Sequence, residues 1–146
     1  MPQTGQRADF VRDFNFLVEI DNIAQASFTE CTGVGTTTEV IEIRQGGDNT
    51  RVMKFPGKTS CSDITLKWGM TDSTELWDWR QQIVDGQMVL KNGALIAFDL
   101  TNHVEKARWN FTNAWPTKFE VPAFNAKGNA IAIETLVLAV ESLTRG

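Results

Sequence analysis

Apolar and polar residues alternate along several short runs of this chain, which is the pattern of half-buried β-strands. In DFNFLVEID (residues 13–21), the alternation places four apolar side chains on one face: Phe14, Phe16, Val18 and Ile20. The run IAQASFTE (residues 23–30) follows an Asp-Asn turn and is predicted to be the hairpin partner of that strand. Further strands are predicted over residues 36–45, 61–69, 94–101, 104–121 and 131–143.

A helical pattern interrupts these strands at residues 73–85. One stripe recurs at helical spacing: Leu76, Trp79, Arg80 and Ile83. Asp72 and Glu75 have the spacing of a capping box, and Gly86 suits the end of a helix. The pattern therefore predicts one helix whose apolar stripe covers the core of the domain.

Residues 40–60 contain the strongest turn signal in the chain, GGDNTR. The residues before the turn are β-branched, and VMKFPGK after it is expected to be extended until Pro56-Gly57 stops it. We therefore predict a long hairpin or a projecting loop over residues 40–60.

The order of these elements predicts a mainly β fold, an antiparallel sandwich or barrel with one flanking helix. We expect a single domain over residues 1–146, with a loose N-terminal arm over residues 1–12. The final run, residues 131–143, is apolar on both faces, which is typical of a strand covered on both sides. In a small sandwich this suggests that a second subunit covers part of it.

Composition and charge narrow the classes of function. Apolar residues make up 42% of the chain and charged residues 22%, and the net charge of −4 gives no basic footprint for nucleic acid. No apolar run is long enough for a membrane helix, and the start of the chain lacks the apolar core of a signal peptide. The expectation is a protein made and folded in the cytoplasm, with no direct membrane anchor.

Candidate chemistry is sparse. Cys31 and Cys61 are expected to be free thiols, because two cysteines are too few for a disulfide framework. His103, the one histidine of the sequence, falls in a predicted turn without a nucleophile motif, so a small hydrolase built on it is a weak alternative. No catalytic residues, metal site or cofactor are predicted, which favours a structural or assembly protein.

The segment RWNFTNAWPTKF (residues 108–119) is the densest aromatic stretch. Trp109, Trp115 and Phe119 could form the platform of a carbohydrate-binding β-sandwich, which is the alternative function. Packing within a core or an interface is the competing interpretation, and Pro116 is then expected to end the strand. Whether Trp115 is buried within one subunit or between two stays open.

Several segments, in this order, resemble the tail tube proteins of contractile-tailed phages. They are FNFLVEI, ASFTECTGVGTTTEVIEIRQGGDN, KFPGKTSCSDITLKWGM, LWDWRQQIVDG, RWNFTNAWPTKFE and AIETLVLAVESL. The resemblance covers roughly residues 10–145 and is nearest to the inner tube subunits of phage-like contractile injection systems. Its most specific parts are the GGDN…KFPG segment, the LWDW helix and the WNFTNAWP stretch.

The resemblance implies a structural subunit without catalysis or cofactor. Six copies would close into a ring, and rings would stack into a hollow tube that sheath contraction drives through a target envelope. It implies as partners other copies of the chain, a sheath protein, baseplate or spike proteins and tube-capping proteins. The lumen would carry a cargo protein or phage DNA.

Three groups of residues are expected to form the assembly surfaces. By the resemblance, the hairpin contacts the neighbouring ring through Arg44, Gln45, Asp48, Asn49, Arg51, Met53, Lys54 and Phe55. The same resemblance places the outer face of the helix toward the sheath, with Glu75, Trp77, Asp78 and Gln81. Strand polarity suggests lumen-facing positions at Ser27, Thr29, Asp63, Thr65 and Lys67.

Overall fold

A computed structural model describes residues 14–23, 28–44, 46–47, 51–101, 103–124 and 132–146. The arm expected over residues 1–12 lies outside the described residues, as do Ser27, Gln45, Asp48 and Asn49.

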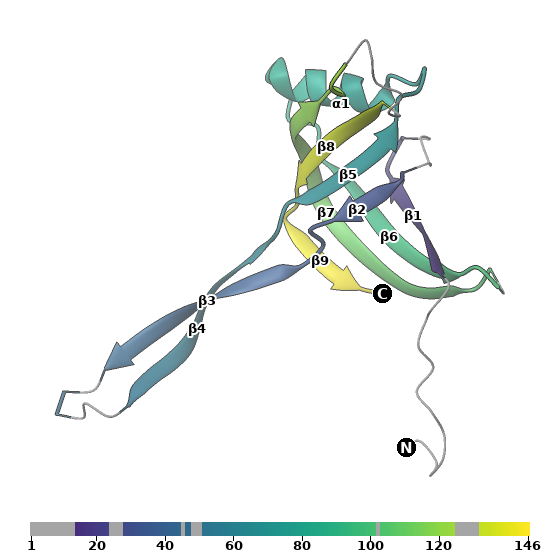
Figure 1. Cartoon of the computed structure of the whole chain (residues 1–146). Helices are drawn as coiled ribbons and strands as arrows, with labels where there is room; N and C mark the ends of the chain where they lie inside the picture. Colours follow the sequence, from purple (N-terminus) through teal and green to yellow (C-terminus); the bar gives the residue numbers. More distant parts are fainter. Residues whose placement is uncertain (1–13, 24–27, 45, 48–50, 102, 125–131) are drawn as a thin grey trace.

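The described chain forms nine β-strands and one α-helix (Figure 1). In chain order they are β1 (Phe14–Ile20), β2 (Glu30–Thr32), β3 (Thr36–Arg44), β4 (Val52–Cys61), β5 (Ile64–Gly69), α1 (Glu75–Val84), β6 (Lys91–Asp99), β7 (Glu105–Glu120), β8 (Ile133–Ala139) and β9 (Ser142–Arg145). Every strand pairing is antiparallel. The predicted mainly β, antiparallel fold with one helix is confirmed.

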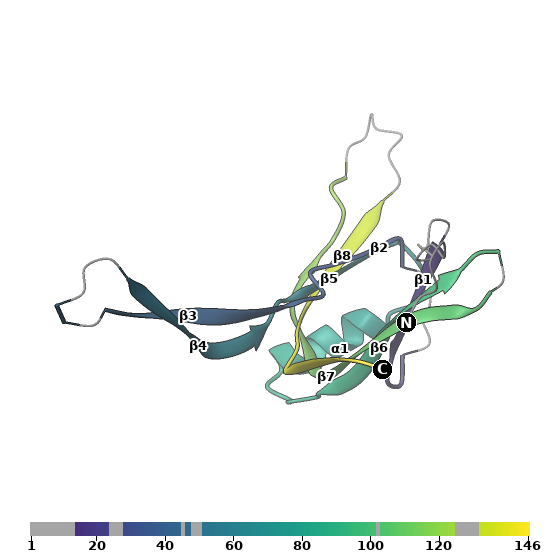
Figure 2. The same ribbon diagram turned by 90° about the horizontal axis from the view of Figure 1, so that it is seen from below.

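The long strand β7 links two layers of sheet (Figure 2). Its first half pairs with β6 and β9, and β1 lies beyond β6; we refer to these strands as the first sheet. Its second half pairs with β8, followed by β5 and β2, and these form the second sheet. Within the described residues this path ends at β1 and β2, so the subunit is an open sandwich and not a closed barrel.

One hydrophobic core fills the space between the two sheets and α1. It draws on alternate residues of strands from both sheets and on two helix residues: Val18, Ile20, Ile64, Leu66, Trp68, Leu76, Trp79, Phe111, Ala114, Leu136 and Leu138. Trp68 lies at its centre, with its ring edge-on to Phe28 and Phe119 at centroid distances of 5.8 and 5.7 Å. The period-two patterns seen in the sequence therefore correspond to inward-facing positions.

The strand β7 continues through Pro116, so the expectation that this proline ends the strand was wrong. The pairing of β7 with β8 shifts between Pro116 and Lys118, and such a bulge tolerates a residue without an N–H group. The Arg80 side chain of α1 donates a hydrogen bond to the Pro116 carbonyl at 3.1 Å. The helix thus supplies a hydrogen-bond donor for the backbone carbonyl at the bulge of β7.

The predicted hairpin partner of β1 was also wrong. β1 pairs with β6. Of the described residues in this range (23 and 28–30), only Glu30 belongs to a strand, the short β2, which pairs with β5. The local turn after β1 is closed by an isolated bridge between Ile20 and Ile23. Residues 24–27 lie outside the described chain. The pairing that forms is non-local, and the local turn signal did not predict it.

The final apolar run divides into two strands. β8 pairs in the second sheet, whereas β9 crosses to the first sheet and pairs with β7, so the single strand predicted over residues 131–143 was wrong. Leu136 and Leu138 are fully buried in the core, while Val137 on the opposite face is half-buried. The two apolar faces therefore have different surroundings within one subunit.

The helix α1 matches the prediction at its centre but not at its start. Leu76 and Trp79 are buried, and Trp79 Nε1 donates to the Val89 carbonyl at 2.9 Å, which holds the following loop against the helix. The N-cap residue is Thr74 and it makes no side-chain capping bond, so the expected Asp72–Glu75 capping box was wrong. Because the helix begins at Glu75, Asp72 stands two residues before the N-cap position.

Cys31 and Cys61 are free thiols, as predicted. Burial raises the pKa of Cys31 to about 11, so this thiol stays neutral well above its ordinary titration range. In a Cys61→Ser variant at pH 8.5, we expect iodoacetamide to modify Cys31 about two orders of magnitude more slowly in the folded protein than in urea. The folded rate should rise as the pH approaches 11, and equal folded and unfolded rates by mass spectrometry would contradict this.

Candidate assembly interface

The β3–β4 hairpin extends away from the two-layered body (Figure 1). Every residue of β3 is exposed, and only Gly57 and Cys61 of β4 are half-buried. Six large apolar side chains of the hairpin are exposed: Val40, Ile41, Ile43, Val52, Met53 and Phe55. An isolated two-stranded ribbon is marginally stable in water. We therefore expect contact with a partner to stabilise this hairpin.

The strand register gives the hairpin two different faces. Ile41 is directly opposite Phe55, and Ile43 is opposite Met53; residues paired in this way lie on the same side of the ribbon. These four residues define what we call the apolar face of the hairpin. The opposite face carries the Glu42–Lys54 and Arg44–Val52 pairs together with Val40 and Pro56.

The strand β4 also continues through Pro56-Gly57, where the sequence predicted a stop. The register shifts between Thr38 and Val40, opposite this dipeptide, which again places a proline at a bulge. A Cβ atom on Gly57 would lie 3.1 Å from the Ile41 side chain, so a glycine lets Ile41 fold closely over β4. The hairpin is thereby longer than the sequence suggested.

The four described residues proposed for the lumen lie at the outer surface of the second sheet. Thr65 and Lys67 alternate with the buried Ile64, Leu66 and Trp68, so they face away from the core. Lys67 Nζ lies 3.3 Å from Glu30 Oε2, and the Thr29 hydroxyl donates to the Lys67 carbonyl. Asp63 precedes this strand and is exposed.

The four helix residues expected to face the sheath are all exposed. Asp78 accepts a hydrogen bond from the Thr74 hydroxyl, and the Gln81 amide donates to Asp85. The Trp77 ring packs edge-on against Phe119 at 5.0 Å but remains 48% exposed. The surface of α1 thus combines an acidic edge with one partly covered indole.

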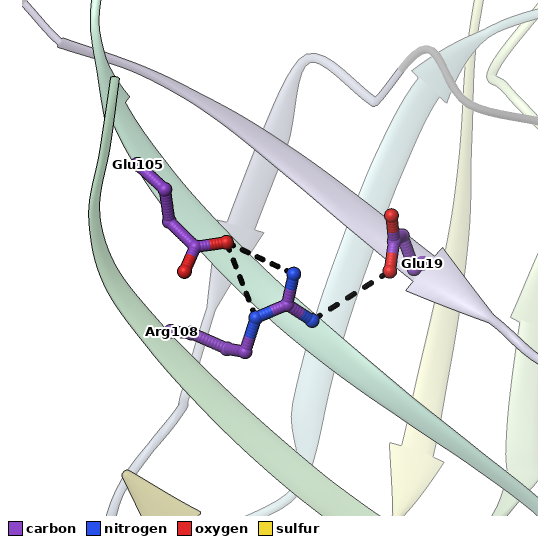
Figure 3. A network of polar contacts seen from close by, with 3 residues as sticks. All are labelled: Glu19, Glu105 and Arg108. Atoms are coloured by element: carbon purple, nitrogen blue, oxygen red, sulfur yellow. Dashed lines mark hydrogen bonds and ion pairs between the residues drawn. The ribbon is translucent and has the colours of Figure 1, made fainter. Parts of the chain in front are cut away.

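A polar network that was not predicted lies on the outer surface of the first sheet (Figure 3). Arg108 donates from Nη2 and Nε to Glu105 Oε1 at 2.9 and 3.2 Å, and its Nη1 lies 3.7 Å from Glu19 Oε2. The hydrogen bond to Glu105 raises the pKa of Arg108, so the guanidinium stays charged. The network joins β1 to β7 above the buried Ile96, beside a polar groove of about 590 Å³.

The aromatic segment does not form an exposed platform. Trp109 is paired with Leu95 on the inward face of the first sheet, and Phe119 lies inward between Trp68 and Trp77. Trp115 is paired with Ala139 and is half-buried. Because these three side chains do not share one exposed face, they lack the arrangement that a sugar-binding surface needs.

Groups that could carry catalysis or bind a metal ion are few among the described residues. His103 lies in the exposed turn between β6 and β7 at φ 51°, where its backbone N–H bonds the Asp99 carbonyl. In the described residues, no group of three or more His, Cys, Asp or Glu side chains could hold a metal ion. No helix in the described part of the chain is long and apolar enough to span a membrane.

The sequence model of the family described as T4-like virus tail tube protein gp19 matches residues 12–144. The chain belongs to this tail tube family. A comparison with curated protein sequences gave no match.

Solved structures share the tail tube fold over nearly the whole chain. A chain of the PVC sheath–tube complex, an extracellular contractile injection system in its extended state, is 26% identical; the match covers 98% of this chain and 93% of that chain with a TM-score of 0.80. A chain of the anti-feeding prophage cap is 24% identical, covering 100% and 99%, with a TM-score of 0.83. A chain of the anti-feeding prophage baseplate is 20% identical, covering 97% of each, with the same TM-score.

Membership of a tail tube family makes exposed surfaces, such as the hairpin, the candidate functional sites of this chain. The structure unites Met53 and Phe55 on one face of the hairpin and places Arg44 and Lys54 on the other. Ile41 and Ile43 complete the apolar face, and the sequence analysis did not single them out. Their alternation with Glu42 and Arg44 was a usable signal, but only the register shows that they oppose Met53 and Phe55.

Proposed function

We propose that this tail tube protein is the structural subunit of the inner tube of a contractile injection system or contractile phage tail. Six copies close into a ring, and the rings stack into a hollow tube that sheath contraction drives through a target envelope. The observation that carries the proposal is the β3–β4 hairpin, which exposes an apolar face on a ribbon too small to be stable alone. The family membership supplies the kind of assembly in which such a hairpin is useful.

The open sheet supports closure into a ring. Among the described strands the path ends at β1 and β2, and unpaired edges invite pairing with another chain. A head-to-tail contact whose rotation closes produces a ring and leaves no free edge, and stacked rings form a filament. Val137 on the outer face of β8 is paired with Thr65 of β5, so this half-buried face belongs to the outer surface of the second sheet and not to an edge of the sheet.

The outer surface of the second sheet is the proposed lining of the lumen. It presents Thr65, Lys67, Thr29 and Asp63, a mixed polar surface suited to the passage of a hydrated cargo protein or of phage DNA. Six copies at −4 each give about −24 per ring, so pairing between subunits or counter-ions must offset the repulsion along the tube.

The exposed surface of α1 is the proposed contact with the sheath. Trp77 offers an apolar anchor beside Asp78 and Gln81, and Glu75 adds charge at the start of the helix. The likeness to a chain of a sheath–tube complex supports a sheath partner, and likeness to chains of cap and baseplate structures supports contacts at the two ends of the tube.

Electron microscopy tests the proposal directly. The purified chain, concentrated alone and with its sheath and baseplate proteins, should give sixfold rings and stacked tubes with a central channel. A chain that stays monomeric under all these conditions, measured by light scattering and negative-stain imaging, would overturn the proposed function.

A further inference from the structure

Two segments of the chain cross from one sheet to the other at the same place. One is the middle of β7, and the other is the link between β8 and β9, which contains Glu141. Asn113 lies at the crossing point of β7, between Thr112, which pairs with β9, and Trp115, which pairs with β8. Its φ of 52° is left-handed, a conformation that asparagine tolerates better than most residues. Such a conformation within a strand is held by its surroundings and points to a function for them.

Hydrogen bonds tie the two crossing segments together around Asn113. Its side-chain amide donates to Glu141 Oε2 at 2.5 Å, and its backbone N–H donates to Asn92 Oδ1 at 3.0 Å. The backbone N–H of Glu141 donates to the Thr112 carbonyl at 3.0 Å, and the hydroxyls of Thr112 and Ser142 bond each other. We call Asn113 and Glu141, with the bonds between their two segments, the crossing clasp.

The crossing clasp adjoins the base of the β3–β4 hairpin, which leaves the body beside the link between β8 and β9 (Figure 1). The thiol of Cys61, the last residue of β4, donates to the Glu141 carbonyl at 3.6 Å. The Ser62 N–H donates to the Gly35 carbonyl at 3.0 Å, and that bond joins the two ends of the hairpin to each other. The contact between Cys61 and Glu141 therefore relates the hairpin to the place where the sheets cross.

We propose that Asn113 and Glu141 are positioning residues, which fix the direction in which the hairpin leaves the body. This inference rests on the proposed tube function, because a hairpin of fixed direction loses less conformational entropy when its partner binds. The clasp holds the β8–β9 link on β7, and the link carries the carbonyl against which Cys61 lies. Both clasp side chains are exposed and neither belongs to the core, so loss of the clasp leaves the core intact and removes the support of the hairpin base.

Distance measurements on the dispersed subunit test the positioning role. Spin labels are attached at Lys54→Cys on the hairpin and at Gln82→Cys on α1, both exposed positions. The background carries Cys31→Ala and Cys61→Ser, and the serine keeps a hydroxyl donor toward the Glu141 carbonyl. Double electron–electron resonance should give one narrow distance distribution for this background.

Four variants of this labelled background separate the clasp from a general loss of charge. Glu141→Ala and Asn113→Gly should each give a distribution about twice as wide, because the hairpin base regains conformational freedom. Glu141→Gln retains an oxygen acceptor for the Asn113 amide, so it should restore the narrow distribution. Glu120→Ala is the matched control: it removes an exposed carboxylate that is paired with Lys118 instead, and it should leave the distribution narrow.

Asn113→Asp adds a readout that a merely structural role would not move. It sets a second carboxylate against Glu141, so repulsion should widen the distribution at about pH 7.5, and protonation of the pair should narrow it again at about pH 4.5. Other charged groups of this region bond elsewhere: Asp21 accepts from a backbone N–H at the start of β6, and the Lys91 amine lies over the Trp79 ring. Asn113→Gly lacks the second carboxylate and should stay wide at both pH values. An Asn113→Asp distribution that stays wide at the lower pH would contradict the clasp.

The same changes in the unlabelled chain relate the clasp to assembly. Glu141→Ala and Asn113→Gly should raise the concentration needed for tubes about three- to tenfold, and Glu141→Gln should stay within about twofold of the parent. Narrow distributions in Glu141→Ala and Asn113→Gly, or an unchanged tube threshold, would overturn this inference and leave the tube function intact. Failure of the parent chain to form tubes would overturn the proposed function, whereas the distances in the dispersed subunit would still decide whether the clasp positions the hairpin.

Discussion

Replacing Trp68 with alanine should lower the free energy of unfolding of the subunit by about 3–5 kcal/mol. Trp68 is only 2% exposed and contacts Phe28 and Phe119 edge-on, so its removal leaves a cavity where both sheets meet. A domain of this size is stable by about 5–15 kcal/mol, so the change is a large fraction of the total. Urea denaturation followed by far-UV circular dichroism, at one protomer concentration for parent and variant, measures it.

Trp77→Ala is the matched control for this change. Trp77 is the same residue type and contacts the same ring, Phe119, but nearly half of its surface is exposed. Its loss should cost less than half as much, because little cavity forms and water already reaches the indole. Equal losses for the two variants would mean that the core is not centred on Trp68 as the structure has it.

The strands and the helix were predictable because side-chain period is a local property. The alternation of Ile64, Leu66 and Trp68 corresponds to buried positions, and the helical spacing of Leu76 and Trp79 places both in the core. Buried positions recur every two residues in a strand and about every 3.6 residues in a helix, so the apolar pattern of a short run is enough to predict which side chains are buried.

The pairing of those strands was not predictable in the same way. β1 pairs with β6, more than seventy residues later in the chain. No turn signal near β1 indicates which distant strand will be its partner. Pro116 and Pro56 were read as strand ends because a proline lacks the N–H of a regular ladder. Both lie at register shifts, and a bulge is a property of two strands together, which one strand's sequence does not show.

The β3–β4 hairpin was likewise predictable in its local features but not in its register. The turn signal after Arg44 correctly indicated a hairpin, but which residues share its apolar face depends on the register with β4. No role was predicted for Arg108, the first residue of the aromatic stretch. Its neighbour Glu105 is three residues away and could have been noticed, whereas Glu19 approaches it only because β1 and β7 both flank β6.

Changing the apolar face of the hairpin to threonine should abolish tubes while leaving the subunit folded. The variant carries Ile41→Thr, Ile43→Thr, Met53→Thr and Phe55→Thr. Threonine retains the β-branched shape that suits a strand, so the ribbon keeps its backbone preference and loses only its apolar surface. None of the four side chains belongs to the buried core, so the circular dichroism and the midpoint of urea unfolding of the dispersed subunit should change little.

The expected size of this effect follows from the burial of those side chains. Full burial of a large apolar side chain contributes about 1.5–3 kcal/mol, and these four are already partly covered in the single subunit. Taking half of that value gives about 3–6 kcal/mol for each hairpin contact, and each 1.4 kcal/mol is a factor of ten in an equilibrium constant. The concentration needed to form tubes, measured by sedimentation and electron microscopy, should therefore rise by about two to four orders of magnitude.

The opposite face of the same ribbon provides the control for this experiment. Val40→Thr with Val52→Thr removes two apolar side chains, at least as exposed as Ile43 and Met53, from the face that carries Glu42, Arg44 and Lys54. Compared with the matched pair Ile43→Thr and Met53→Thr, this double change should raise the threshold concentration at least tenfold less, since a charged face stays more hydrated in the contact. If the control pair blocks tubes as strongly as the matched pair, the contact surrounds the hairpin and is not confined to its apolar face. If the fourfold variant still forms tubes at the parent's concentration, the hairpin does not hold the rings together.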